Sequence, residues 1–186
     1  MRRALDLIYS GALVLSALAL VAIALLVLTQ IAGRLLDRAL LALGREVVGI
    51  QIPSLAEIGG FLFVAAAFLA LPATLRAGVH VRVSLLTHAL ARGPARALLA
   101  LVLSLALGLA GFAAWHSWLQ ALDSWQFDSV SYGMLRIPLW LPQGAMTLGL
   151  AIFALALADE LQACLRGRDP AFLAAETARQ IDAAER

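Results

Sequence analysis

The sequence predicts an all-α membrane protein with four transmembrane helices. Hydrophobic residues make up 62% of its 186 residues and charged residues only 14%, whereas soluble domains average about 45–50% and 25%. Four stretches contain no Asp, Glu, Lys or Arg and together account for half of the chain. Each is long enough to cross a hydrocarbon core of about 30 Å as a helix. We therefore expect a single four-helix transmembrane domain over residues 1–165, followed by a C-terminal tail over 166–186.

The first two uncharged stretches are Leu7–Gly33 and Ile58–Leu75. The first is longer than the apolar region of a signal peptide, which spans about 7–15 residues, and we expect it to be an uncleaved first span. The second is the shortest of the four, and it contains Pro72. Because proline cannot donate a helical hydrogen bond, we expect Pro72 to kink or break the last turn of this span.

Between these spans, residues 34–57 have an amphipathic pattern. Apolar side chains recur every three or four residues, which predicts a helix between spans one and two; they are Leu36, Leu40, Leu43 and Val47. This helix either lies at the outer membrane surface or bends off the first span, or else it packs against neighbouring spans. Pro53 and Ser54 end it, and Ser54 with Glu57 three residues later is typical of a capping box at the start of the second span.

The third and fourth uncharged stretches are Ala97–Leu122 and Ile137–Ala158. Pro138 and Pro142 flank Trp140 at the start of the fourth, where proline is tolerated because the first N–H groups of a helix have no partner. Small residues let membrane helices approach closely. We therefore expect close helix contacts at four glycines, namely Gly59, Gly60, Gly108 and Gly111.

The distribution of arginine predicts the topology. All fourteen cationic residues are Arg. Ten of them fall in the N-terminal tail, the loop between spans two and three and the C-terminal tail, and four fall in the other two connections. Arginine is enriched on the cytoplasmic side of membrane proteins. We therefore expect both termini in the cytoplasm and residues 34–57 and 123–136 on the outer side.

The sequence offers little for catalysis, metal binding or cofactor binding. Cys164 is the single cysteine, so an intramolecular disulfide is excluded. His116 is the one histidine within a span, whereas clamping a haem between facing helices takes two. The excess of arginine is interpreted as membrane-flanking charge, with no nucleic-acid partner. Because no charged residue lies at the centre of a span, where ion-coupled carriers have functional groups, we expect a helical support for another protein rather than an enzyme or a complete carrier.

Two motifs resemble the small membrane subunit, DctQ-like, of tripartite ATP-independent periplasmic (TRAP) transporters. One opens with Glu57-Ile-Gly-Gly-Phe-Leu-Phe-Val at the start of span two and ends with Leu75-Arg76-Ala-Gly78-Val-His80-Val-Arg82-Val in the inner loop. The other is Ile137-Pro138-Leu-Trp140-Leu-Pro142 at the start of span four. The resemblance extends over residues 5–165. Ser84 differs from the family, which commonly has an acid there.

The resemblance implies a non-catalytic scaffold in a sodium-coupled importer of the bacterial inner membrane. Its partners would be membrane lipids, a large membrane subunit that carries an organic acid, and a periplasmic binding protein that delivers it. The motif residues would then be orienting or interfacial residues: Glu57, Arg76, Gly78, His80, Arg82, Pro138, Trp140 and Pro142. The small subunit of another tripartite carrier and a haem protein remain alternatives, and the solute stays open.

The outer loop from Asp123 to Pro142 is a candidate docking site for the periplasmic protein. It contains several aromatic residues and one cation. We expect Phe127 and Asp128 to contribute to docking, because aromatic residues are enriched at protein interfaces. The alternative is an aromatic belt at the membrane surface, where such residues are also enriched.

Overall fold

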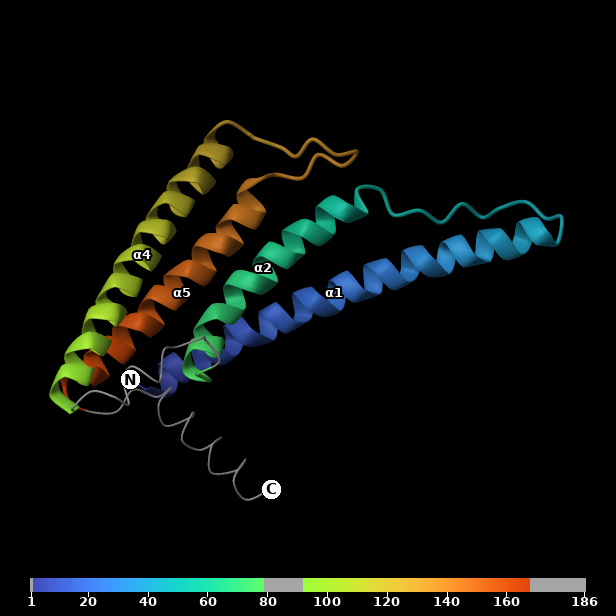
Figure 1. Ribbon diagram of the computed structural model, residues 1–186. Coiled ribbons are helices and arrows are strands. Elements are labelled where there is room, and N and C mark those ends of the chain that lie inside the picture. The colour runs from blue at the N-terminus through green and yellow to red at the C-terminus, as the bar shows by residue number, and fades with distance from the viewer. Residues whose placement is uncertain (1, 79–91, 168–186) are drawn as a thin grey trace, which may run out of the picture.

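The computed structural model describes residues 2–78 and 92–167 of the chain and contains four long helices (Figure 1). These are α1 (Arg2–Ala42), α2 (Leu55–Arg76), α4 (Arg92–Gln126) and α5 (Trp140–Leu165). All four are long and apolar enough to cross a membrane, and each contains most of one uncharged stretch. The predicted number of spans is confirmed.

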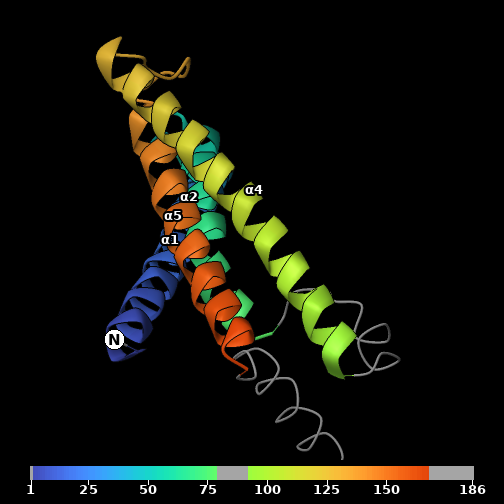
Figure 2. The same ribbon diagram turned by 90° about the vertical axis from the view of Figure 1, so that its left-hand side faces the viewer.

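The helices form an open row in the order α4, α5, α2, α1 (Figure 1). α5 packs along α4 on one side and along α2 on the other, and α2 in turn packs along α1. In the view turned by 90°, the lower parts of α1 and α4 lean to opposite sides (Figure 2). Of the two helices at the ends of the row, α4 packs along α5 and α1 packs mainly along α2, so the four described helices do not close into a bundle.

α1 packs on α2 through residues spaced alternately three and four apart. The buried positions are Tyr9, Ala12, Ser16 and Ala19, and the same spacing leads on to Gln30 and Gly33, which contact Ile52 and Ile50 ahead of α2. This is the 3.5-residue repeat of helices that cross at a small angle. Most of these side chains are small, which permits close approach in a membrane. Ser16 Oγ donates a hydrogen bond of 2.7 Å to the carbonyl oxygen of Ala66 in α2.

α2 and α5 approach closely one turn before Pro72, where Gly149 meets Phe68. We expected Pro72 to kink or break the last turn of the span; it does not break it, because α2 continues through Pro72 to Arg76. Pro72 has no N–H for the carbonyl of Phe68, one turn earlier. Gly149 of α5 lies against that carbonyl, and a Cβ there would be 2.6 Å from its oxygen. Only glycine permits this approach without displacing backbone.

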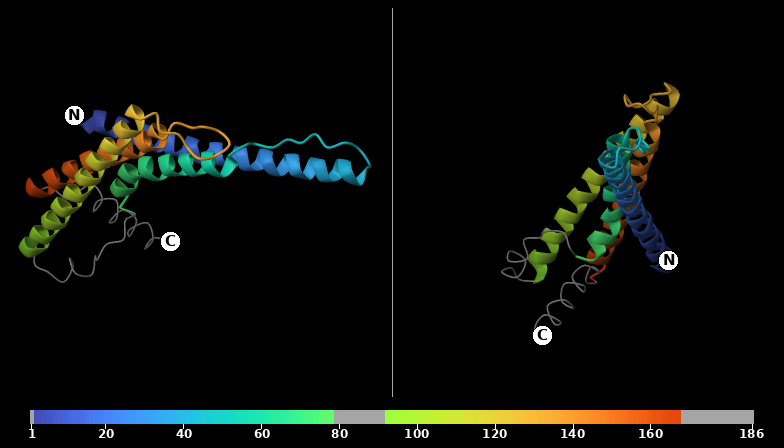
Figure 3. Two further views of the ribbon diagram at one scale, coloured as in Figure 1. Left: turned by 90° about the horizontal axis from the view of Figure 1, so that it is seen from above. Right: turned by 90° about the vertical axis from the view of Figure 1, so that its right-hand side faces the viewer.

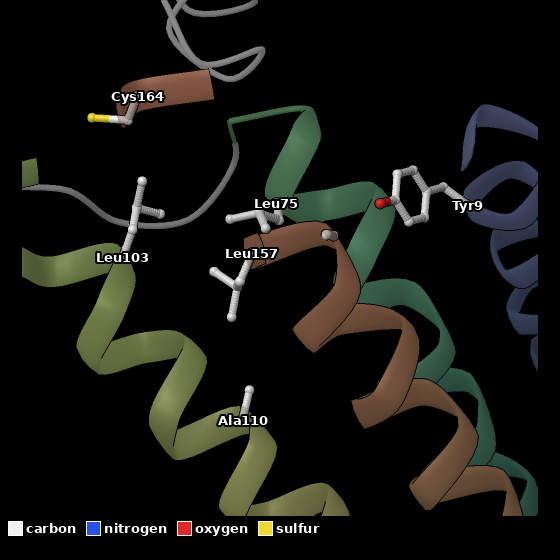
Figure 4. Close-up of a cluster of buried hydrophobic side chains, with 7 residues drawn as sticks. Tyr9, Leu75, Leu103, Ala110, Leu157 and Cys164 are labelled. Atoms are coloured by element: carbon white, nitrogen blue, oxygen red, sulfur yellow. The ribbon is translucent and has the colours of Figure 1, made fainter. Parts of the chain in front are cut away.

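The core of the molecule lies where α5 meets α2 and α4. Leu157 of α5 is almost completely buried, with Leu103 and Ala110 of α4 on one side and Leu75 of α2 on the other (Figure 4). A hydrogen bond of 2.7 Å between Ser117 Oγ and Thr147 Oγ1 also joins α4 to α5. These contacts fix α5 as the central helix of the packed region.

The amphipathic segment after the first span differs from its prediction. It is not a separate helix, since α1 continues without a break to Ala42 and extends past the start of α2 (Figure 3). Residues 43–54, here called the return segment, then run back along α1. Asp37 Oδ1 accepts hydrogen bonds from the N–H groups of Val48 (2.9 Å) and Gly49 (3.1 Å). The return segment therefore contacts α1 on the side of Gly33 and Asp37, while Leu36 remains 44% exposed.

Candidate functional site

The end of the row that holds the return segment and residues 127–139 is called the outer end, following the predicted orientation. α1 and α4 finish there, and α2 and α5 begin there. The opposite, inner end holds Asp6, Arg76 and Cys164. The predicted site residues that the structure describes gather at these two ends.

Residues 127–139 form an ordered loop, here called the outer hairpin, between α4 and α5. Its two arms pair through the hydrogen bonds Leu139 N to Ser129 O and Ser131 N to Ile137 O, both 2.9 Å. Ser131 Oγ strengthens the turn by donating to the carbonyl oxygen of Leu135 at 2.9 Å and accepting from the N–H of Ile137 at 3.1 Å. The hairpin therefore has a defined shape.

The outer hairpin rests on the start of α2. The N–H of Leu135 donates to Ser54 Oγ at 3.1 Å. Gly133 lies directly against Glu57 and Ser54: a Cβ there would overlap the Glu57 carboxylate and be 2.7 Å from Ser54 Oγ. These three residues, Ser54, Glu57 and Gly133, are called the hairpin seat.

The capping-box prediction for Ser54 and Glu57 was wrong. Ser54 precedes α2, but its φ of 54° lies in the left-handed region, and its side chain makes no hydrogen bond to the first turn. The N–H groups of Glu57 and Ile58 instead donate to the Ser54 carbonyl oxygen at 3.0 Å. The Ser54 hydroxyl accepts a hydrogen bond from the N–H of Leu135 in the hairpin instead of from an N–H group in the first turn of α2.

Glu57 has a second unusual feature. Its Oε2 atom is buried and has no hydrogen-bond partner among the residues that the structure describes. The positive end of the helix macrodipole favours a carboxylate in the first turn of α2. Burying a carboxylate oxygen that accepts no hydrogen bond is nevertheless costly. The contact with the hairpin therefore stabilises the loop but removes water from the Glu57 carboxylate.

The predicted docking residues lie at the beginning of the hairpin. Phe127 is 74% exposed, and Asp128 is exposed with a φ of 47°. Trp140 at the start of α5 makes an edge-to-face contact with Trp125 of α4, with ring centroids 4.9 Å apart. Pro142 lies in the first turn of α5, in accord with the prediction for this motif. Pro138 pairs with Val130 in an isolated β-bridge.

At the inner end, the motif residue Arg76 is engaged within the chain. It forms an ion pair with Asp6 of α1, and its guanidinium carbon lies 5.2 Å from the centre of the Tyr9 ring. Gly78 follows α2 with a φ of 64°, which glycine adopts readily. His80 and Arg82 lie outside the described residues. Arg76 thus joins α2 to α1.

Sequence reasoning missed Glu160, which is only 2% exposed in α5. In the sequence Glu160 comes just after the last uncharged stretch, so it was counted with the charged residues of the C-terminal tail. The helical spacing of Ala156, Leu157, Ala163 and Cys164 places Glu160 on the buried face of α5, and this spacing was the available signal. Its charge acts on Arg76 and Tyr9.

The remaining candidates for cofactor or metal binding are not gathered into a site. His116 is exposed on α4, and the centre of its ring lies 4.3 Å from the centre of the Phe112 ring. Within residues 2–78 and 92–167, no group of three or more His, Cys, Asp or Glu side chains could hold a metal ion. The geometry is that of packed helices with an ordered outer loop.

Comparison with known proteins identifies the family. The family model described as the DctQ component of tripartite ATP-independent periplasmic transporters matches residues 23–167, a range that contains both motifs, the outer hairpin and three complete helices. No curated protein matches the chain. The match selects this family over the alternatives of another tripartite carrier or a haem protein. The chain belongs to the DctQ family, the small permease component of TRAP transporters.

Proposed function

We propose that the chain is the non-catalytic scaffold subunit of a sodium-coupled TRAP transporter that imports an organic acid. In this proposal it lies in the bacterial inner membrane with both termini in the cytoplasm. It stabilises the large membrane subunit, which moves the solute, and helps to dock the periplasmic binding protein. The family supports the place in the transporter, and the remaining roles rest on the arguments below.

The observation on which the scaffold role rests is the open row of helices. In the most apolar window of each span, between 11% and 33% of the residues are buried within the chain. α4 packs along α5 and α1 mainly along α2, which leaves long apolar surfaces available to lipid and to another membrane protein. A row of this kind adds a wide, stationary wall to a larger subunit.

The position of charge supports the same role. The acids and arginines of the described helices lie within a few turns of a helix end, as Asp6, Arg76, Asp123 and Glu160 do. Carriers that couple ions to a solute place ionisable or unwound elements near the membrane midplane. We therefore assign solute and sodium binding to the large subunit.

Reconstitution tests the scaffold role. Proteoliposomes are prepared with both membrane subunits or with each subunit alone. Purified binding protein is added outside, where the sodium concentration is higher than inside, and the uptake of a radiolabelled organic acid is measured. We expect uptake with both subunits, none with this chain alone, and a lower yield of monodisperse large subunit when this chain is omitted. Sodium-driven uptake by this chain alone would contradict the proposal.

The docking role is tested at the residues named from the sequence. Asp128→Arg and Phe127→Ala should lower uptake while the two membrane subunits still purify together. If the loop is only an aromatic belt, Trp125→Ala and Trp140→Ala should reduce insertion or stability, and Asp128→Arg should leave uptake unchanged at every concentration of binding protein.

A further inference from the structure

We infer that the binding protein docks on the tip of the outer hairpin through Tyr132 and Met134, and that Gly133 between them positions this tip on α2. The inference rests on the proposed docking function and goes beyond Phe127 and Asp128. It assigns contact to residues that sequence reasoning did not select, and it gives the hairpin seat a function.

The path of the hairpin places its tip over the end of the helix row. The hairpin leaves α4 and returns to α5, yet its tip contacts α2 through Gly133 and Leu135. α5 lies between α4 and α2 in the row. The tip must therefore cross the outer end of α5, and Figure 1 shows the loop extending from the top of α4 toward the start of α2.

This location separates the tip from an aromatic belt. Side chains in a belt project sideways from a span at the membrane surface. Trp115 and Trp118, which are exposed on α4, are the residues that we assign to such a belt. With the predicted topology, a tip that covers this end of the row faces the outer aqueous side. Large exposed apolar groups in such a position are typical of a protein interaction site.

The two side chains at the tip have the chemistry of an interface. Tyr132 is fully exposed and Met134 is 86% exposed. Tyrosine supplies a wide apolar face with a polar edge, and methionine adapts its shape to an irregular surface. Both types are enriched at protein interfaces. The partner that fits is a folded soluble protein with an apolar patch, and the periplasmic binding protein of this transporter family is that partner.

Gly133 explains how the tip is kept in place. A side chain at this position would overlap the Glu57 carboxylate, and the neighbouring Leu135 is already bonded to Ser54 Oγ. A Cβ at residue 133 would require the Glu57 carboxylate and the Ser54 hydroxyl to move aside, and the tip would move with them. A loop that is ordered before binding loses less conformational freedom on docking, so the seat should increase affinity without touching the partner.

The test uses the complex of both membrane subunits in nanodiscs and proteoliposomes, with purified binding protein as the probe. We expect Tyr132→Ser/Met134→Ser to raise the concentration of binding protein needed for half-maximal uptake at least tenfold. Uptake at saturating binding protein and the yield of the membrane complex should be unchanged. Trp115→Ser/Trp118→Ser is the control for exposed aromatic residues on the side of a span and should shift that concentration less than twofold.

The seat is tested with a matched pair of glycine variants. Gly133→Ala should raise the half-saturating concentration at least threefold, whereas Gly144→Ala should not, since nothing lies within 4 Å of a Cβ at Gly144. Ser54→Ala, which removes the hydrogen bond to Leu135 without adding bulk, should shift it in the same direction as Gly133→Ala.

The possible outcomes separate the inference from the proposed function. If Asp128→Arg raises the half-saturating concentration but the tip variant leaves it within twofold, docking stands and the tip inference is overturned. If the tip variant instead lowers insertion or yield, the tip contacts membrane and the inference is also overturned. If no hairpin variant alters the dependence on binding protein, both the inference and the docking role fail.

Discussion

Arg76 provides the sharpest test of how the row of helices is held together. Its side chain is 29% exposed and is paired with Asp6, which is 51% exposed. It also lies over the Tyr9 ring. One residue of α2 thus contacts two side chains of α1. Arg76→Glu removes every one of these attractions and adds a carboxylate beside Asp6.

The expected loss of stability is the sum of modest contributions. A solvent-accessible ion pair contributes about 0.2–1 kcal/mol, and a cation over an aromatic ring at an accessible site contributes about 0.5–1 kcal/mol. A cation in the last turn of a helix contributes about 0.3–1 kcal/mol through the macrodipole. Together these predict a loss of about 2 kcal/mol. For a chain of this size that corresponds to a fall of about 4–8 °C in Tm.

The assay is thermal unfolding of the purified protein in detergent, with the yield of the complex with the large subunit as a second readout. Arg166→Glu is the matched control, because it makes the same charge change at the inner end and is exposed. It should lower Tm by less than about 2 °C. Arg179, in the C-terminal tail, is expected to tolerate the same change, and it lies outside the described residues.

A charge exchange makes the test specific. Asp6→Arg combined with Arg76→Asp restores an ion pair between α1 and α2 and should recover part of the loss. Equal shifts for Arg76→Glu and Arg166→Glu would refute the reasoning. A charge exchange no more stable than Arg76→Glu would show that Asp6 is not the partner that matters.

Three further predictions follow from the helix contacts and the arginine distribution. Gly149→Val should lower Tm by several degrees, because overpacking against a backbone carbonyl of α2 costs about 1–3 kcal/mol, while Gly144→Val, which faces open space, should lower it by less than half as much. Ser16→Ala should cost about 0.6 kcal/mol, the average for a hydrogen bond between membrane helices, and a loss above about 2 kcal/mol would show that packing, not the bond, is affected. In a cysteine-free background on intact cells, an impermeant maleimide should label a cysteine at Asp128 and not one at Arg92, and the reverse pattern would overturn the topology.

The sequence alone was sufficient for the number of spans and the family resemblance. In lipid, a spanning segment must satisfy its own backbone hydrogen bonds, so a long uncharged stretch becomes a helix whatever its neighbours are. For this reason Leu7–Gly33 and Ala97–Leu122 could be assigned locally, and both lie within helices. The Pro-Trp-x-Pro motif likewise identified the start of α5, because proline restricts the first turn of a helix.

Two sequence patterns identified residues that matter in the structure but predicted the wrong local arrangement for them. Ser54 and Glu57 have the spacing of a capping box, yet the Ser54 hydroxyl bonds to Leu135, 81 residues away. The segment after Gly33 is amphipathic as expected, but the first break in its helix comes at Gly44, whose φ is 67°. In the first case the local pattern was silent about a contact made by a distant part of the chain, and in the second it identified a helix but not the residue at which that helix ends.

The order of the helices was decided only in the tertiary structure. Gly59, Gly60, Gly108 and Gly111 were expected at close contacts, but no atom lies within 4 Å of a Cβ at any of them. The close approach between two helices occurs instead at Gly149 of α5, which lies against the Phe68 backbone of α2, whereas Gly33 meets Ile50 of the return segment and Gly133 of the outer hairpin meets the Glu57 and Ser54 side chains. Lipid tails are as apolar as the side chains of a neighbouring helix, so hydrophobicity does not distinguish the packed face of a span from its lipid-facing side. Which small residue meets which backbone depends on the complementary shapes of two helices, and neither helix's sequence contains that information by itself.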